Sequence, residues 1–316
     1  MENYSSELSE ELTQQGISYD TWNRWWSVTT EPKVWPQAKN YDTIIVRLPK
    51  SHEAFDMILH AISTVINDKG TIIVYGLNDE GIKGAQKKMA EFFGNNEICG
   101  FKKRVRIISS KITKKEVEEI KKSLEDFKST SLLSYTPPNT DTSISLNMIF
   151  YPGMFASGQL DAGTKILLDH TLSSIQKDSY ILDYGSGSGI IAHILNELYP
   201  KITIDLLDRD IISLVAAAEN FPQHNNMINA DSLTSCNNKY DLIISNPPIH
   251  TEKEEHYRTL YQLIANVPHY LKEGGKLILV AQSRINLQEK FINAGMSSHI
   301  IAENSRFKVW SGRVTD

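Results

Sequence analysis

The end of one apolar run carries polar and rigid residues that could perform chemistry. The run "YDLIISNPPIH" spans Tyr240 to His250, and its apolar part predicts a buried strand. Each proline fixes its own φ at about −65°, and Pro248 also keeps Pro247 out of the helical region. The carbonyl of Pro247 is therefore held in one direction, next to the side-chain oxygen of Asn246. Two fixed acceptors of this kind suit a planar amino group, whose lone pair is delocalised and poorly nucleophilic.

A glycine-rich loop supplies the second motif. "YILDYGSGSGIIA" places Gly185, Gly187 and Gly189 between a predicted strand and a predicted helix. Glycines let the backbone turn tightly and a ligand approach, and a helix start offers free N–H groups. A dinucleotide fold needs G-x-G-x-x-G, whereas the sixth position here is Ile190. The spacing is D-x-G-x-G-x-G from Asp183, which resembles the S-adenosylmethionine (SAM) loop of Rossmann-like methyltransferases; a purely structural turn is the alternative.

Acidic residues follow the next two predicted strands. Asp208 ends "ITIDLLD", at the distance where a carboxylate can take both hydroxyls of a bound ribose. Asp205 and Asp210 are rivals, but Asp205 lies inside the strand and Asp210 beyond its end, which favours Asp208. Asp231 follows the third strand and could accept a hydrogen bond from an adenine amino group, or it could only cap a turn.

Together these motifs predict methyl transfer to a planar nitrogen. Accepting both N–H groups aims the nitrogen at the sulfonium methyl, and holding that methyl about 3 Å away in line supplies a large proximity effect. A strong general base is not required, because the methylated nitrogen is acidic enough to lose its proton to water or a carbonyl. We therefore expect no catalytic histidine. His250 is a candidate for positioning the base, with an ordinary surface residue as the alternative.

The hydrophobic pattern predicts the elements that position these motifs. From Ser179 onward, short apolar runs alternate with helical patterns, which predicts an α/β fold with a mostly parallel sheet covered on both faces. Asn246 then lies at the switch point where such sheets bind ligands. Two late strands with no helix between them predict an antiparallel hairpin. The expected strands are 180–184, 202–207, 227–230, 242–245, 276–281, 299–302 and 307–310, and the expected helices are 190–198, 211–219 and 257–271.

The first half of the chain partly repeats the second. "YDTIIVRLPK" from Tyr41 matches "YDLIISNPPI", and "INDKGTIIVYG" from Ile66 matches "YLKEGGKLILVAQ". The agreement in order and spacing predicts a duplication with a period of about 200 residues, with chance similarity as the alternative. We expect a degenerate methyltransferase-like domain over 1–130, with a substrate-binding or scaffold role. A polar link over 129–147 and a catalytic domain over 148–316 follow.

Composition argues against several other classes. The chain has 316 residues, a net charge of −5 and a pI of about 6.0, so any RNA contact needs a local basic patch. Its apolar runs are far shorter than the roughly 20 residues of a bilayer crossing, and its acidic start is neither a signal nor a transit peptide. Cys99 and Cys236 give no disulfide framework and no metal cluster. We expect a cytoplasmic protein without metal or membrane association.

Four segments carry a family resemblance: "YPGMFASGQLDAGTKILL", "ILDYGSGSG", "YDLIISNPPIH" and "FKVWSG". They resemble the RsmC family of 16S ribosomal RNA guanine-N2 methyltransferases. The resemblance implies two Rossmann-like methyltransferase domains, of which the first has lost its cofactor loop. The first half fits this description, because no glycine-rich loop precedes Tyr41 and "RLP" stands where the second half has "NPP". The first copy should therefore be catalytically silent.

The resemblance also implies roles for single residues. SAM, which leaves as S-adenosylhomocysteine, would be bound by Asp183, Gly185, Gly187, Gly189, Asp208, Asp231 and Asn246. The guanine amino group would be held by Asn246, Pro247 and Pro248. The cofactor pocket would be covered by Phe155, Gly158, Leu160 and Asp161. Related enzymes usually have an aromatic residue where this chain has Ile249, so stacking worth roughly 1 to 3 kcal/mol is lost unless Phe155 or His250 replaces it.

A basic strand in the first half is the candidate RNA contact. In "FKKRVRII", Lys102, Arg104 and Arg106 alternate onto one face, where they could meet phosphates. The alternative is a solvated sheet edge that basic residues protect.

Two other apolar patterns in the first half favour packing within the protein over contact with RNA. One predicts an amphipathic helix through Val117, Ile120, Leu124 and Phe127. The other pattern is an aromatic cluster formed by Trp22, Trp25 and Trp26. It favours a helix docked on its own domain, with a platform for stacking RNA bases as the alternative.

Three functions fit these motifs. The leading hypothesis is a monomeric enzyme that methylates a guanine amino group in ribosomal RNA or the small ribosomal subunit. The second is a protein glutamine-N5 methyltransferase, but that family has an aromatic residue after Asn-Pro-Pro and a small helical amino-terminal domain. The third is an inactive ribosome-assembly protein, which the intact Asp183, Asp208 and Asn246 argue against.

Overall fold

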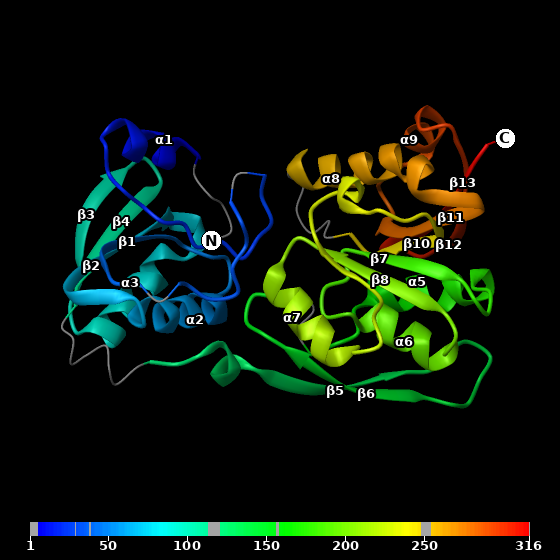
Figure 1. The fold of residues 1–316 in the computed structure, drawn as a ribbon, viewed down its shortest axis with the longest axis horizontal. Helices are drawn as coiled ribbons and strands as arrows, with labels where there is room; N and C mark the ends of the chain where they lie inside the picture. The colour runs from blue at the N-terminus through cyan, green and yellow to red at the C-terminus, as the bar shows by residue number, and fades with distance from the viewer. Residues whose placement is uncertain are drawn as a thin grey trace. The chain divides into compact units, whose positions relative to one another are not determined.

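The computed structural model describes residues 6–28, 30–37, 39–112, 121–155, 158–247 and 254–315. The chain divides into two compact units. Unit 1 comprises Met1–Lys128 and Tyr151–Gly153, and unit 2 comprises Ser129–Phe150 and Met154–Asp316. Each unit contains its own mixed sheet flanked by helices (Figure 1).

The sheet of unit 2 has seven strands in the order β12-β13-β11-β10-β7-β8-β9. Strands β7 to β11 run parallel, whereas β13 is antiparallel to both β11 and β12. The predicted parallel sheet and closing hairpin are therefore confirmed. The inner strands are apolar almost throughout because both of their faces are covered. The strands are β7 (Tyr180–Tyr184), β8 (Thr203–Asp208), β9 (Met227–Asn229), β10 (Tyr240–Ser245), β11 (Leu271–Gln282), β12 (Met296–Glu303) and β13 (Phe307–Val314).

Helices cover both faces of this sheet, with α6 and α7 on one side and α8 and α9 on the other (Figure 1). Leu260, Leu263 and Ile264 of α8 recur at helical spacing and are buried in the same cluster as Leu182 and Ile243. The third predicted helix ends earlier than expected because residues 267–270, which include a proline, form a 3₁₀ turn before β11. The helices of unit 2 are α5 (Ala162–Thr171), α6 (Ile190–Leu198), α7 (Ile211–Asn220), α8 (Glu254–Asn266) and α9 (Gln288–Asn293).

Residues 129–147, predicted as a polar link, instead belong to a β-hairpin. Strand β5 (Ser129–Tyr135) pairs antiparallel with β6 (Ile144–Phe150), and both strands are part of unit 2. Polar residues alternate here with apolar ones, so one face is exposed while Leu133, Leu146 and Met148 are buried. The serines and threonines that suggested a linker are thus the outward face of a strand pair.

Unit 1 has a four-stranded sheet in the order β1-β2-β4-β3, which repeats the order β10-β11-β13-β12 of unit 2. The match extends to an irregularity: the register shifts after Tyr41↔Ile66 in unit 1 and after Tyr240↔Leu271 in unit 2. This agreement supports the predicted duplication. The elements are α1 (Ser6–Gln14), β1 (Tyr41–Arg47), α2 (His52–Ser63), β2 (Ile66–Leu77), α3 (Ile82–Phe93), β3 (Glu97–Lys102) and β4 (Val105–Lys111).

The duplication is incomplete in one half of the sheet. In unit 2, β10 pairs with β7 on one side and β11 on the other, whereas among the described residues β1 pairs only with β2. The described part of unit 1 therefore has no counterpart of β7, β8 and β9, the strands that carry the glycine loop and the acidic residues. The position that matches Asn246 holds Arg47, whose guanidinium forms an ion pair with Glu80.

The prediction that Lys102, Arg104 and Arg106 lie on one strand is wrong. Residues 101–108 belong to two strands, because β3 and β4 form a hairpin with Lys103 and Arg104 in the turn and Lys102 opposite Val105. Lys103 has a φ of 55°, in the left-handed region. Neither turn residue is glycine, asparagine or aspartate, so the usual hairpin signal was missing. Lys102 and Arg104 are exposed, but Arg106 donates a hydrogen bond to Gln86 and does not share a strand face with them.

Two smaller predictions also change. Of the predicted amphipathic helix, residues 113–120 lie outside the described part of the chain, and Leu124–Phe127 forms only a 3₁₀ turn. The tryptophan cluster belongs to an irregular segment and not to a helix, but Trp22 packs against the core of its own unit as expected.

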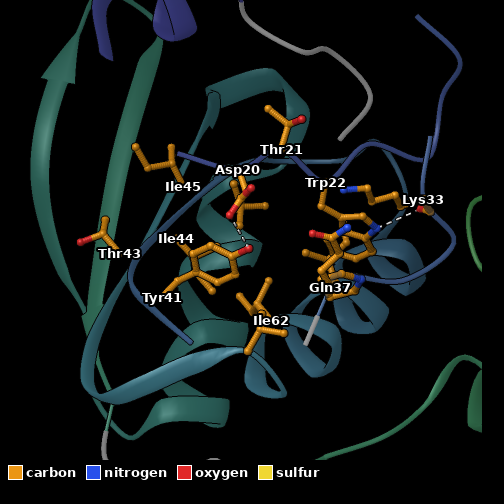
Figure 2. A pocket seen from close by; sticks show the side chains of 14 residues that line it. Asp20, Thr21, Trp22, Lys33, Gln37, Tyr41, Thr43, Ile44, Ile45 and Ile62 are labelled. Atoms are coloured by element: carbon orange, nitrogen blue, oxygen red, sulfur yellow. Dashed lines mark hydrogen bonds between the residues drawn. The ribbon is translucent and has the colours of Figure 1, made fainter. Parts of the chain in front are cut away.

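A cavity of about 120 Å³ lies beside β1 in unit 1 (Figure 2). Its wall includes Trp22, Tyr41 and Ile44, and the carboxylate of Asp20 accepts hydrogen bonds from Tyr41 and Lys39. No glycine loop borders it, so it is not the counterpart of the site described next.

Candidate functional site

The predicted site residues of unit 2 follow from the register of the sheet. Ser245 of β10 lies opposite Tyr184 of β7, so Asn246 and Gly185 leave the sheet side by side. Asp208 ends β8, the other neighbour of β7. The motifs therefore gather at the carboxyl ends of the parallel strands. They lie at the switch point between β7 and β10, from which the following strands are added in opposite directions.

The glycine loop has the open backbone that a ligand requires. Gly185, Gly187 and Gly189 have φ angles of 74°, 53° and 77°, a region that other residues rarely adopt. A Cβ atom at Gly185 or Gly187 would meet no atom within 4 Å, whereas one at Gly189 would lie 3.2 Å from Ala217. The first two glycines thus leave space for a ligand, and the third lets α6 begin close to α7.

Asp183 is a fully buried ionisable group beside this loop. Its side chain is 0% exposed, and neither carboxylate oxygen has a hydrogen-bond partner among the described residues. Burial raises the pKa of Asp183 to about 7; the nearby Asp208 carboxylate adds to the rise, and the Ala192 amide opposes it. The hydroxyl of Ser186, which borders the cavity, is also buried without a partner. Two buried polar groups without partners indicate that a polar ligand group belongs here.

Asp208 holds the loop from the neighbouring strand. Its carboxylate accepts hydrogen bonds from the amides of Gly187 and Asp210, both at 2.8 Å. Burial raises the pKa of Asp208 to about 6, with a further contribution from Asp210 and opposing hydrogen bonds from the two amides. This carboxylate is in place to exchange its bond to the loop for bonds to a ligand hydroxyl.

Its two rivals have structural roles. Asp205 is fully buried and accepts hydrogen bonds from the hydroxyls of Tyr180 and Tyr240, as well as from two asparagines. Asp210 caps α7 by accepting from the amide of Ile212. The choice of Asp208 over both is therefore supported by where the three side chains point.

Asn246 has its carboxamide oriented by neighbours from another part of the chain. Its Nδ2 donates to Thr164 Oγ1 at 2.9 Å and to Asp161 Oδ2 at 3.2 Å. A carboxylate only accepts, so the NH₂ group must face Asp161 and the Oδ1 atom points elsewhere. The Pro247 residue that follows is buried.

A cavity of about 40 Å³ joins these groups. Asn246, Asp161 and Thr164 form part of its wall, and the glycine loop forms another part, together with Phe155 and Leu160. Phe155 is 47% exposed, so it borders the cavity from the solvent side. Gly158 lies near Ser131, whose hydroxyl donates to the Gly158 carbonyl, and it is not in the wall.

Other predicted residues are placed differently or not at all. Asp231 is exposed and does not border the cavity, although its carbonyl accepts a hydrogen bond from Tyr184. Pro248, Ile249 and His250 lie outside the described residues.

Two residues that sequence reasoning missed support the site. Thr164 follows Asp161 at the spacing of a helix cap, a signal that was available. Asn220, at the end of α7, donates to the carbonyls of Ser188 and Ile149 and accepts from the Ile149 amide, so it ties the glycine loop to β6. No local pattern marks Asn220, because its partners lie far away in the sequence.

Two features are absent from the described residues. No helix among them is long and apolar enough to cross a membrane. No group of three or more histidine, cysteine, aspartate or glutamate side chains there has the arrangement of a metal site.

The sheet order, the glycine loop and the polar edge define the class of protein: a Rossmann-like methyltransferase fold. The chain matches the family model of the methyltransferase small domain over residues 145–311 and that of its N-terminal domain over residues 5–127. It therefore belongs to the methyltransferase small domain family, and the expected RsmC-like arrangement with two such domains is confirmed.

Relatives agree with this assignment. The chain is 26% identical to the ribosomal RNA small subunit methyltransferase C of Aliivibrio fischeri, over 87% of this chain and 78% of that protein. It is 29% identical to the protein of that name from Pseudoalteromonas translucida, over 86% and 77% of the two chains. The fold matches that of the T. thermophilus 16S rRNA N2 methyltransferase RsmC, solved with AdoMet and guanosine, with a TM-score of 0.76 and 15% identity over 98% of this chain and 81% of that one.

Proposed function

We propose that this chain transfers the methyl group of SAM to the N2 amine of a guanine in 16S ribosomal RNA. The observation that carries the proposal is the orientation of Asn246, whose Nδ2 atom donates to Asp161 and Thr164 and so leaves the carboxamide oxygen to accept from an amino group. Asn246 also lies in the wall of the cavity that the glycine loop borders. The names of the relatives and the guanosine in the solved RsmC complex point to the same base.

The residues around the loop fit SAM. Asp183 and Ser186 are buried without partners, and SAM carries an ammonium group and hydroxyls that could supply them. Gly185 and Gly187 leave open space at the loop, and Asp208 has the carboxylate that ribose hydroxyls require. When bound, SAM supplies a methyl group that its sulfonium already activates.

The roles of the protein groups in the reaction follow from their chemistry. Asn246 Oδ1 and the Pro247 carbonyl accept the two N–H bonds of the amine, which orients its lone pair toward the methyl carbon. The nitrogen–carbon bond forms as the carbon–sulfur bond breaks and its electron pair passes to sulfur. The nitrogen then releases one proton to water, so no histidine is needed. We infer that the reaction needs no metal ion, because the methyl group of SAM is activated before it binds. We also infer that the enzyme acts as a monomer in the cytoplasm.

The first unit has a supporting role in this proposal. Its described residues lack counterparts of the strands that hold the cofactor, and Arg47 replaces the asparagine. We expect no methyl transfer there. Lys102, Lys103 and Arg104 are exposed around the β3–β4 turn and would contact RNA phosphates.

Two experiments test the function. Purified protein with labelled SAM and in vitro transcribed 16S RNA, or small subunits from cells lacking the gene, should produce N2-methylguanosine on nuclease digestion and mass analysis. Nucleosides from a deletion strain should lose one N2-methylguanosine in 16S RNA. An unchanged nucleoside profile, together with no transfer to either RNA substrate, would reject the proposal.

A further inference from the structure

The start of helix α5 contacts Asn246, although it contributes no residue to the Asn-Pro-Pro motif. Asp161 is the N-cap of α5 and accepts hydrogen bonds from the amides of Gly163 at 2.9 Å and Thr164 at 3.2 Å. The same carboxylate accepts from Asn246 Nδ2, at 3.2 Å to Oδ2 and 3.4 Å to Oδ1. One side chain thus connects a helix cap to the residue that would grip the substrate.

We infer that Asp161, acting with Thr164, is a positioning residue that fixes which end of the Asn246 carboxamide faces the substrate. This inference rests on the proposed function of Asn246. A carboxamide can turn by 180° about its last bond, which exchanges an acceptor for a donor at nearly the same place. Only the orientation with Oδ1 toward the substrate accepts from an amino group; the other would present N–H to N–H.

The hydrogen bonds of Thr164 exclude the turned orientation. Its hydroxyl has a single proton, and that proton is donated to the Asp161 carboxylate. Thr164 Oγ1 can therefore only accept from Asn246, which it does at 2.9 Å. Both neighbours of the carboxamide are acceptors, so a turned Asn246 would place its oxygen against two other oxygens.

The packing leaves little room for another arrangement. A Cβ atom at position 163 would lie 3.0 Å from Asp161 Oδ1 and 3.4 Å from Asn246 Oδ1, and the residue there is glycine. Gly163 and Thr164 are buried, and Asn246 is partly buried, so water has limited access to compete for these bonds.

The test compares variants that remove the acceptors with variants that keep them. Asp161→Asn keeps a residue that caps helices well but replaces one acceptor by a donor. Thr164→Val keeps the shape and removes the hydroxyl, whereas Thr164→Ser keeps the hydroxyl. We expect kcat for methyl transfer to 16S RNA to fall about 10- to 100-fold in the first two, the range seen when groups that orient metal ligands are removed. Thr164→Ser should retain most of the parental kcat, and the Kd for SAM should change far less than kcat in all three.

Two controls separate positioning from stability. Ser51 caps α2 in unit 1 by accepting from the Ala54 amide, so Ser51→Ala removes a comparable cap and should leave kcat unchanged. The double variant Asp161→Asn/Asn246→Ala should be no slower than Asn246→Ala alone, because without the Asn246 carboxamide Asp161 has no side chain left to orient.

The outcomes distinguish this inference from the proposed function. If Asn246→Ala retains parental activity, the role of Asn246 in the proposed function is wrong. If Asn246→Ala is inactive while Asp161→Asn and Thr164→Val both keep the parental kcat, the function stands and the positioning inference is overturned. Should Asp161→Asn fail to fold, the pair Thr164→Val and Thr164→Ser still decides.

Discussion

Replacing Asp183 by asparagine should stabilise the free protein while it weakens SAM binding. Asp183 is 0% exposed, has no hydrogen-bond partner among the described residues, and has a pKa raised by burial from 3.8 to about 7. At pH values between 3.8 and about 7, Asp183 holds a proton in the folded chain that it releases in the unfolded chain. The free energy of unfolding therefore falls as the pH rises through this range, and it levels off above about pH 7.

The size of the effect follows from the pKa difference. At about 1.4 kcal/mol per pH unit, the interval from 3.8 to about 7 corresponds to about 4.5 kcal/mol above pH 7. Asp183→Asn has nearly the same shape and no charge to bury, so it should be more stable than the parent by up to this amount at pH 8. At pH 5 the gain should shrink to less than about half, because the parent side chain is then protonated.

Binding should change in the opposite direction. Loss of a charge-assisted hydrogen bond worth about 1.5 to 3 kcal/mol would raise the Kd for SAM about 10- to 100-fold. A gain in stability that accompanies a loss of affinity is the pattern expected of a group held for its ligand.

The assay is urea unfolding without SAM at several pH values from 5 to 8, together with calorimetric titration by SAM. Asp205→Asn is the matched control, because Asp205 is equally buried but accepts hydrogen bonds from Tyr180, Tyr240 and two asparagines. That control should be destabilised by about 3 kcal/mol, since its donors lose a charged acceptor. If Asp183→Asn is less stable than the parent at pH 8, or if its stability difference does not change with pH, the reasoning about this carboxylate is refuted.

Three further substitutions probe the same edge of the sheet. Asp208→Ala should raise the Kd for SAM about 100-fold in calorimetry, because two acceptor bonds to ribose are lost, but it should leave kcat at saturating SAM near the parental value. An equal loss of SAM affinity and kcat would contradict the assignment. Asn220→Asp should lower the free energy of unfolding by about 3 kcal/mol in urea, because a carboxylate would face the carbonyls of Ile149 and Ser188 at 2.9 and 3.0 Å; parental stability would show that Asn220 does not hold the loop. Gly187→Val should abolish SAM binding while circular dichroism stays parental, since its φ is 53° and the added side chain would enter the open space; tight binding would mean the ligand lies elsewhere.

Local sequence patterns were enough to predict the sheet and its motifs. The apolar runs predicted the strands of the seven-stranded sheet of unit 2 to within about five residues, and α6 matches the predicted helix 190–198. Glycines and prolines act on their own backbone, so the glycine loop and the rigid end of β10 could be recognised without knowledge of their neighbours. The repeated order of apolar runs also predicted the duplicated topology that both sheets share.

What the sequence did not decide depends on pairing between distant residues. Serines and threonines on β5 and β6 resembled a linker because only the pairing of the two strands shows which face is buried. The β3–β4 turn was missed because its residues lack the usual turn signal, and Lys102, Arg104 and Arg106 were therefore assigned to one strand.

The arrangement of side chains at the candidate site depends on distant partners in the same way. Asp205, Asp208 and Asp210 are all aspartates in one short stretch, and only the hydrogen bonds of each side chain separate a core anchor and a helix cap from Asp208, the proposed ligand group. The orientation of Asn246 depends on Asp161, which is 85 residues away in the chain. Backbone preferences are local and can be read from residue types, whereas hydrogen-bond partners and buried charges exist only once the strand register has brought those residues together.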